Sequence, residues 1–419
     1  MISTQISPRF YETIVKEAGN KRDAAKRLHL TIAEGLKSKK FTADQVSIAG
    51  IGYALGVLDP HSPHGSFEQL LAESRTMDPG QINEHVIYSE SASGLMTNAF
   101  NTITSELISS MVMDGYQDES NYIGSKLCRT IPAKRRNQKI VGLTALGGPL
   151  EVGENQPYSE TDFTEKFVTT EEVKKGRIIS LTEELVFFDE MGIIADRARS
   201  IGFYMRQDKE RTIVRGVQDA DTGTGKYVYR PSGTAEALYA TDGSNYNYIG
   251  SGGLSGYTSA VPLEDWTDVD TVLQFRNTKV VDDRIDGTPQ PIAGLNGMDC
   301  VLLVPGALRG TASSIVNQTE FRKTTNTSNV GISPGNPVSG FIGDVLTSPH
   351  VDAVNTGHWY YGNFKKQFAW MQLWPLQTFV QGQNSEAGFD RDVALRVKVR
   401  ELGGLVATDS IWVTKVLAS

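Results

Sequence analysis

The feature that most constrains the fold is residues 139–180, a stretch with strand-like ends and an acidic middle interrupted by Gly and Pro. We expect two long strands that run outward from the body of the protein and return. A two-stranded hairpin is only marginally stable alone in water, so this excursion needs a partner surface. The acidic residues of this stretch are Glu151, Glu154, Glu160, Asp162 and Glu165, and one basic residue, Lys166, lies near them in the sequence.

A second constraint is the stretch DVALRVKVR at 392–400, which alternates between apolar and basic residues. Alternation with a period of two is typical of a strand with one buried face. We expect Val393, Leu395, Val397 and Val399 to face a core, and Arg396, Lys398 and Arg400 to point outward. The strand by itself leaves three partners open for these cations: nucleic acid, an anionic substrate or another protein.

Helices are expected at both ends of the excursion. Residues 1–80 read as short amphipathic helices, in which Phe10, Ile14 and Val15 share one face. A stronger helix is predicted at 91–113 from apolar residues at three-four spacing. The longest helical pattern is 182–217, whose apolar stripe is Met191, Ile194, Ala195, Ala198, Ile201, Gly202 and Met205.

The remainder mixes both kinds of element. Residues 219–297 are rich in Gly, Ser, Thr, Asn and Tyr and contain one short helix at 263–276. DCVLLVPG is predicted as a buried strand that leads into a helix. The last sixty residues are predicted as strands, namely NFKKQFAWMQL, LQTFV, DVALRVKVR and GLVATDSIWVTKV. Because helices and strands do not alternate as βαβ units, the predicted class is α+β.

Composition excludes several function classes. The chain has 41 basic and 49 acidic residues and a net charge of −8, which argues against a protein whose main task is to grip phosphates. Cys128 and Cys300 are far apart and are expected to be free thiols. The first residues lack a signal-peptide h-region, and the longest apolar run, 46–58, is too short to span a membrane. We therefore expect a soluble protein made in the cytoplasm.

No motif predicts catalysis, a cofactor or a metal. SIAGIGYALG (47–56) resembles a dinucleotide-binding turn, but Pro60 and Pro63 leave no room for the required helix, so a small-residue packing face is favoured. DTGTGKY (221–227) fails the P-loop pattern at two positions. His61 and His64 have no second ligand cluster and read as loop histidines. Residue by residue, the sequence indicates a self-assembling structural protein.

The series of segments resembles the major capsid proteins of tailed bacteriophages. The resemblance rests on the acidic hairpin with EVGENQPY, on KKGRIISLTEELVFFDEMG leading into a long helix, and on the strand-rich tail FKKQFAWMQLWPL with GFDRDVALRVKVRELGGLVATDSIWV. It covers residues 85–419 and implies the Hong Kong 97-type fold, with an N-terminal arm, an extended E-loop, a peripheral domain built on a spine helix, and an axial domain.

The resemblance also implies a division of the chain. The expected parts are a helical arm (1–85), its continuation into the peripheral domain (86–138), the E-loop (139–180), the spine helix (181–218), a mainly axial region (219–359) and C-terminal strands that complete both domains (360–419). Residues 1–85 have no clear counterpart in the family. Asp392 stands where crosslinking capsids have Asn, so no isopeptide bond is expected.

The function implied is a head subunit, located in the virion, that forms hexamers and pentamers around double-stranded DNA without sequence-specific contacts. Portal and scaffold or decoration proteins would be its partners, and no membrane is involved. Because the E-loop of this fold lies across an adjacent subunit, we predict that its acids meet Arg396, Lys398 and Arg400 in an intersubunit charge seam. The alternative for these cations is a solvated strand face.

Two other functions stay open from the sequence. An encapsulin-like compartment shares the implied fold but would store an enzyme cargo. The uninserted, Gly-rich 219–297 region and the long N-terminal arm favour the phage over it. A hydrolase with a dispersed active site is the less favoured alternative, because one sequence does not reveal residues that come together only in the fold.

Overall fold

The structure is a computed structural model of the 419-residue chain. It describes residues 6, 8–18, 21–38, 40–41, 45–55, 92–117, 122–136, 139–143, 152, 154, 165–169, 172–182, 191–220, 238–239, 247–253, 255–278, 280–281, 290–291, 294–319, 323–324, 331–332, 335–381 and 393–418.

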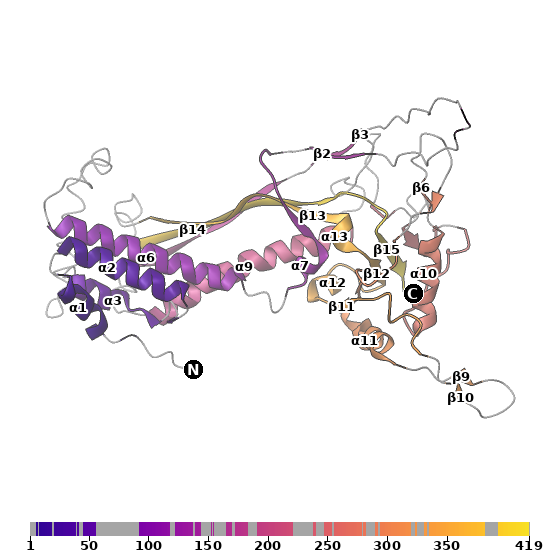
Figure 1. Cartoon of the computed structure of the whole chain (residues 1–419), viewed down its shortest axis with the longest axis horizontal. Helices are drawn as coiled ribbons and strands as arrows, with labels where there is room; N and C mark the ends of the chain where they lie inside the picture. Colours follow the sequence, from indigo (N-terminus) through magenta and orange to yellow (C-terminus); the bar gives the residue numbers. More distant parts are fainter. Residues whose placement is uncertain are drawn as a thin grey trace. The chain divides into compact units, whose positions relative to one another are not determined.

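The chain forms two compact units, each assembled from separate stretches of sequence. Unit 1 comprises residues 1–120, 174–207 and 376–401, and unit 2 comprises residues 121–173, 208–375 and 402–419. Three long elements contribute residues to both units; they are helix α9 (Met191–Val217) and strands β13 (Phe368–Gln381) and β14 (Val393–Ala407) (Figure 1).

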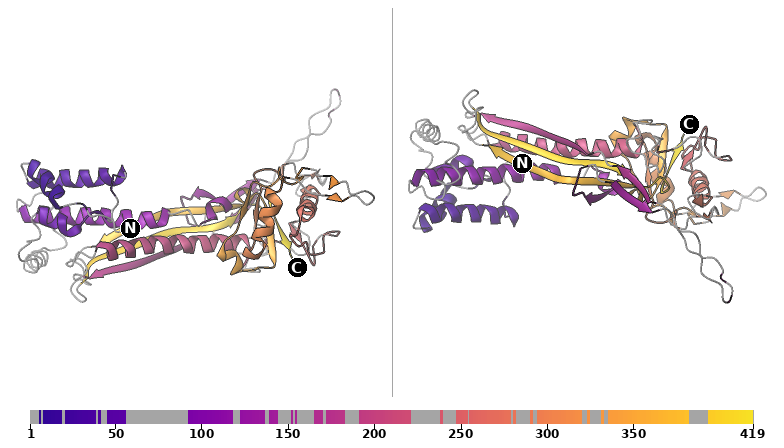
Figure 2. Two further views of the ribbon diagram at one scale, coloured as in Figure 1. Left: turned by 90° about the horizontal axis from the view of Figure 1, so that it is seen from below. Right: turned by 90° about the horizontal axis from the view of Figure 1, so that it is seen from above.

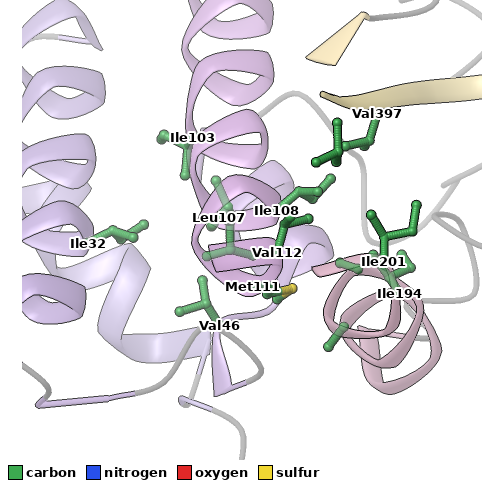
Figure 3. Close-up of a cluster of buried hydrophobic side chains, with 14 of the residues drawn as sticks. Ile32, Val46, Ile103, Leu107, Ile108, Met111, Val112, Ile194, Ile201 and Val397 are labelled. Carbon is green, nitrogen blue, oxygen red and sulfur yellow. The ribbon is translucent and has the colours of Figure 1, made fainter. Parts of the chain in front are cut away.

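Unit 1 contains the predicted helices. The expected amphipathic helices are α1 (Pro8–Glu17), α2 (Lys21–Lys37) and α3 (Ile48–Leu55), and the expected helix at 91–113 is the longer α6 (Ala92–Gln117). The stripe predicted for α9 is buried at Ile194, Ala195, Ala198, Ile201, Gly202 and Met205. Figure 3 shows how α2, α6, α9 and Val397 of β14 converge on one apolar cluster.

The buried face of α1 differs from the expected one. Phe10 is 37% exposed, whereas its neighbour Tyr11 is fully buried. The tyrosine can be buried because its hydroxyl accepts a hydrogen bond from the backbone N–H of Ser47 at 3.1 Å. A Cβ added at Gly50 of α3 would lie 3.1 Å from the Tyr11 ring, so this part of SIAGIGYALG is a helical packing face, as predicted.

Helices α6 and α9 cross at two glycines. A Cβ added at Gly202 of α9 would collide with the carbonyl oxygen of Val112 and lie 2.8 Å from the backbone nitrogen of Tyr116. A Cβ at Gly115 of α6 would collide with the backbone of Arg199. The two backbones therefore touch at this crossing, and any side chain would force them apart.

A four-stranded sheet has the order β1-β13-β14-β4 and includes β1 (Arg129–Pro132) and β4 (Val173–Thr182). Within unit 1, the strands β4 and β14 run beside α9 (Figure 2). The predicted strand at NFKK is wrong, because Phe364–Gln367 is the short helix α13, where the Asn363 side chain accepts a hydrogen bond from the Lys366 N–H. Strand β13 then spans the two tail strands that were expected separately.

Unit 2 contains a five-stranded sheet of order β11-β8-β12-β15-β5, in which β12 is antiparallel to β8 and β15 while the outer pairs are parallel. Mixed pairing without βαβ alternation confirms the α+β class. The strands are β5 (Tyr248–Ile249), β8 (Val301–Leu303), β11 (Asp344–Leu346), β12 (His358–Gly362) and β15 (Val413–Leu417). Helices α7 (Gly124–Leu127), α10 (Trp266–Asn277), η2 (Gly306–Leu308), α11 (Arg309–Asn317) and α12 (Pro349–Asp352) complete the unit.

The predicted excursion begins as a hairpin. Strand β2 (Lys139–Leu143) pairs antiparallel with β3 (Glu165–Thr169), from Lys139 opposite Thr169 to Leu143 opposite Glu165. Strand β4, which the prediction placed at the end of the excursion, belongs to the four-stranded sheet instead. Two shorter pairs are β6 (Val280–Val281) with β7 (Gln290–Pro291) and β9 (Lys323–Thr324) with β10 (Gly331–Ile332).

Arg276 of α10 is fully buried in unit 2. Its Nε donates to Asn296 Oδ1 at 2.9 Å, and its terminal nitrogens donate to Thr414 and to the backbone oxygens of Leu295, Tyr361 and Trp412 at 2.6 to 3.3 Å. These acceptors are uncharged. The guanidinium therefore links α10 to the turn at 294–297 and to β12 and β15 by hydrogen bonds, and it also lies 5.1 Å from the centre of the Tyr361 ring.

His358 of β12 gives unit 2 a dependence on pH. Burial, and secondly the Lys415 ammonium, lower the pKa of His358 from 6.5 to about 4. Between these values the unfolded chain binds a proton that the folded chain excludes, so stability falls as the pH drops from about 6.5 to 4. Between pH 7 and pH 4.5, the urea midpoint of wild type should fall further than that of His358→Phe, because phenylalanine has no proton to bind. Equal losses in both proteins would show that other groups control this window.

Candidate functional site

The sequence-predicted cations lie on β14 with the expected alternation. Val397 and Val399 are buried in the core of unit 1, Lys398 is exposed, and Arg396 and Arg400 are half-buried. The side chains of Val393 and Leu395 lie outside the described residues. The prediction of one apolar and one basic face is confirmed for residues 396–400.

Both Lys398 and Arg400 lie over one aromatic ring on the neighbouring strand. The Lys398 Nζ is 5.2 Å and the Arg400 Cζ 4.5 Å from the centre of the Phe379 ring, which is 42% exposed. Arg400 also donates from Nε to Gln377 Oε1 at 3.1 Å. A cation over an exposed ring contributes about 0.5–1 kcal/mol, which holds the ammonium and guanidinium against the sheet.

Strand β4 extends this surface on the other side of β14. A Cβ added at Gly176 would lie 2.6 Å from the Val399 carbonyl oxygen and 3.2 Å from Arg400 Cβ, so the glycine lets the two strands approach. Lys174 and Ile178 flank Gly176 at two-residue spacing and therefore share its face; both are exposed. We call the surface formed by Lys174, Ile178, Phe379, Arg396, Lys398 and Arg400 the cationic face.

Two cations of the cationic face, Arg396 and Lys398, are not neutralised by the described part of their own chain. No carboxylate there lies within ion-pair distance of Arg396 or Lys398. The Arg396 Nε is moreover buried without a hydrogen-bond acceptor. Exposed apolar side chains beside unpaired cations are typical of a surface that meets another protein.

The acids predicted to face these cations are only partly described. Glu154 is exposed, as is the neighbouring Val152. Glu165 lies in β3 with its side chain outside the described residues, and Glu151, Glu160 and Asp162 lie outside them altogether. The charge seam between hairpin and β14 therefore stays a prediction.

Sequence reasoning missed Phe379 and Gly176. The segment LQTFV signalled a strand, and alternation alone would have placed Gln377 and Phe379 on one face. That this face stands next to Arg400 depends on the strand order of the sheet, which the sequence does not reveal.

Other candidate chemistry can be checked within the described residues. They contain no group of three or more His, Cys, Asp or Glu side chains placed to hold a metal ion. Cys128 and Cys300 are buried free thiols that donate to the carbonyl oxygens of Gly124 and Leu295. His61, His64 and the segment 221–227 lie outside these residues. Among the described helices, none is both long and apolar enough to cross a membrane.

A family model described as phage capsid protein matches residues 167–416, more than half of the chain. No curated protein matches the sequence.

Several solved capsid and particle structures are similar at low identity. The capsid of cyanophage P-SCSP1u has 12% identity and a TM-score of 0.43, with 71% of this chain and 88% of that chain covered. The capsid of cyanophage Pam1 has 14% identity and a TM-score of 0.42, with 69% of this chain and 88% of that chain covered. A virus-like particle from Pyrococcus furiosus has 9% identity and a TM-score of 0.38, with 74% of this chain and 97% of that chain covered.

Proposed function

Because the chain belongs to the phage capsid protein family, it is a structural protein of a phage head, and we propose that it is the major subunit of that shell. The family match over residues 167–416 carries this proposal. It includes α9, strands β4, β13 and β14 and the whole cationic face, so the elements that build the candidate site are those of the family. The α+β architecture is consistent with the Hong Kong 97-type capsid fold.

We assign the hairpin between β2 and β3 to the E-loop, α9 to the spine helix, and residues 1–85 to an N-terminal arm. Hexamers and pentamers of the chain would enclose double-stranded DNA, with a portal and a scaffold or decoration protein as partners. Synthesis would take place in the host cytoplasm and assembly would place the chain in the virion. The role is structural, and no residue is assigned to catalysis.

The proposal is tested by expressing the chain alone and imaging the product by negative-stain microscopy. Closed particles are expected, together with elution at particle size on gel filtration. Elution only as a small folded protein would favour the dispersed hydrolase. Particles purified from infected cells should contain nuclease-protected DNA, whereas an encapsulin-like shell would contain a protein cargo. The family match makes the encapsulin the less favoured alternative.

The charge seam yields a prediction about assembly. Lys398→Glu should impair particle formation while leaving the subunit folded, because the reversed charge would face the acidic hairpin of the next subunit. One exposed pair contributes only about 0–1 kcal/mol, but the contact repeats in every copy and weakens as salt rises. Sedimentation at low and high salt measures the assembled fraction, and circular dichroism measures folding.

Lys365→Glu provides the matched control, since it makes the same charge change at an exposed position of α13. It should assemble like wild type. Charge reversal at Glu154 or Glu160 should partly restore assembly of Lys398→Glu. If Lys398→Glu assembles normally at both salt concentrations, the cations of β14 merely face water.

A further inference from the structure

A second cationic surface lies on unit 2, at the edge strand β1 and the turn that follows it. Residues 121–150 contain six Lys and Arg residues and no acid, in a chain whose net charge is −8. One of them, Lys126, is paired with Asp344 at 2.7 Å. Four are exposed on β1 and its turn, namely Arg129, Lys134, Arg135 and Arg136. We call these four residues the basic turn.

The charge of three arginines of the basic turn is not balanced by the described part of the chain. Within it, no carboxylate lies at ion-pair distance from Arg129, Arg135 or Arg136. Strand β1 is the outermost strand of its sheet and pairs with β13, with Arg129 opposite Ala369 and Thr130 opposite Trp370.

The basic turn differs from the cationic face in one decisive respect. The cationic face combines its charges with exposed Phe379 and Ile178, whereas no large apolar side chain is exposed within residues 122–136. Protein interfaces depend on desolvated apolar or aromatic anchors at their centre. Contacts to a phosphate backbone need only mobile cations, because they derive from charge and counterion release.

We propose that the basic turn binds the phosphate backbone of double-stranded DNA without sequence preference. A strand rises about 3.3 Å per residue, so Arg129 and Arg136 are at most about 23 Å apart. A duplex of that length carries about a dozen phosphates, which is ample for four cations. The inference rests on the proposed head function for the identity of the polyanion, and gives an otherwise acidic shell a local point of DNA contact.

Full-length subunits, separated from particles by gel filtration, are titrated against a labelled 30-base-pair duplex at 50 to 200 mM salt. Each phosphate contact adds about 0.9 to the slope of log affinity against log salt concentration. With four contacts, the affinity of wild type for the duplex should fall by roughly 100-fold over this range. For the triple variant K134Q/R135Q/R136Q the fall should be about threefold, from one remaining contact. At 50 mM salt the triple variant should also bind the duplex more weakly than wild type does.

The control R211Q/R309Q/K365Q also removes two arginines and one lysine, but from exposed sites on α9, α11 and α13. It should keep the wild-type slope. The proposal is overturned if wild type does not bind, if the basic-turn variant keeps its slope, or if both variants lose it equally. Loss of particle formation with unchanged DNA binding would also overturn it and assign the turn to an acidic protein surface. Particle formation is scored separately, so failure of DNA binding leaves the head function standing.

Discussion

Gly202→Ala should destabilise unit 1 by about 2–3 kcal/mol, although alanine is favoured over glycine in a helix by about 1 kcal/mol. The added methyl group would meet the Val112 carbonyl oxygen and the Tyr116 nitrogen, which are backbone atoms and do not rotate away. Helices α6 and α9 would have to separate, and the apolar cluster between them would loosen. Urea unfolding of the subunit, with hydrogen exchange at α6, measures the loss.

Gly310→Ala is the matched control. Gly310 also lies in a helix, α11, but a Cβ there would meet nothing within 4 Å. Its substitution should be neutral or stabilise by up to about 1 kcal/mol. Of the two variants, Gly202→Ala alone should therefore lose stability. A Gly202→Ala protein as stable as wild type would show that the helices shift apart at little cost.

Arg276→Met should destabilise unit 2 by about 3–5 kcal/mol, because several buried acceptors lose their donor at once. Methionine fills much of the same space, but it leaves the Leu295 and Trp412 carbonyl oxygens and the Asn296 side chain without their donor. Orphaned buried acceptors cost roughly 1–3 kcal/mol each. The measurement is urea unfolding followed by near-ultraviolet circular dichroism.

Arg309→Met is the control, because Arg309 is exposed on α11. Its effect should stay within about 0.5 kcal/mol. Arg276→Lys separates charge from geometry, since lysine keeps the charge but reaches fewer acceptors; it should be destabilised nearly as much. If Arg276→Lys is as stable as wild type, the charge and not the set of hydrogen bonds supports the core.

Features that depend on local periodicity were predictable from sequence. The stripe of α9 and the alternation of β14 repeat at 3.6 and 2 residues, and burial follows both patterns. Gly202 was placed on the correct face because it is small. That it permits contact between two backbones was not visible, because the partner helix lies about ninety residues earlier.

Features that depend on distant pairing were missed or misplaced. Strand β4 was assigned to the excursion because it follows β3 closely, but it joins the sheet beside β14, more than 200 residues later. Arg276 has the sequence context of an ordinary polar helix residue, and its acceptors come from three separate segments, at 295–296, 361 and 412–414. Phe379 gains its role only from the adjacent strand. Long-range neighbours, and not local propensity, account for each miss.

The interleaved composition of the two units has a consequence for synthesis on the ribosome. Neither core can close by itself from an early part of the chain, because unit 1 needs residues 376–401 and unit 2 needs residues beyond 402. Contacts of such large sequence separation form slowly and late. The strand that carries Arg396, Lys398 and Arg400 is made after the other two segments of unit 1, so a nascent chain does not yet display the cationic face while its cores are still open.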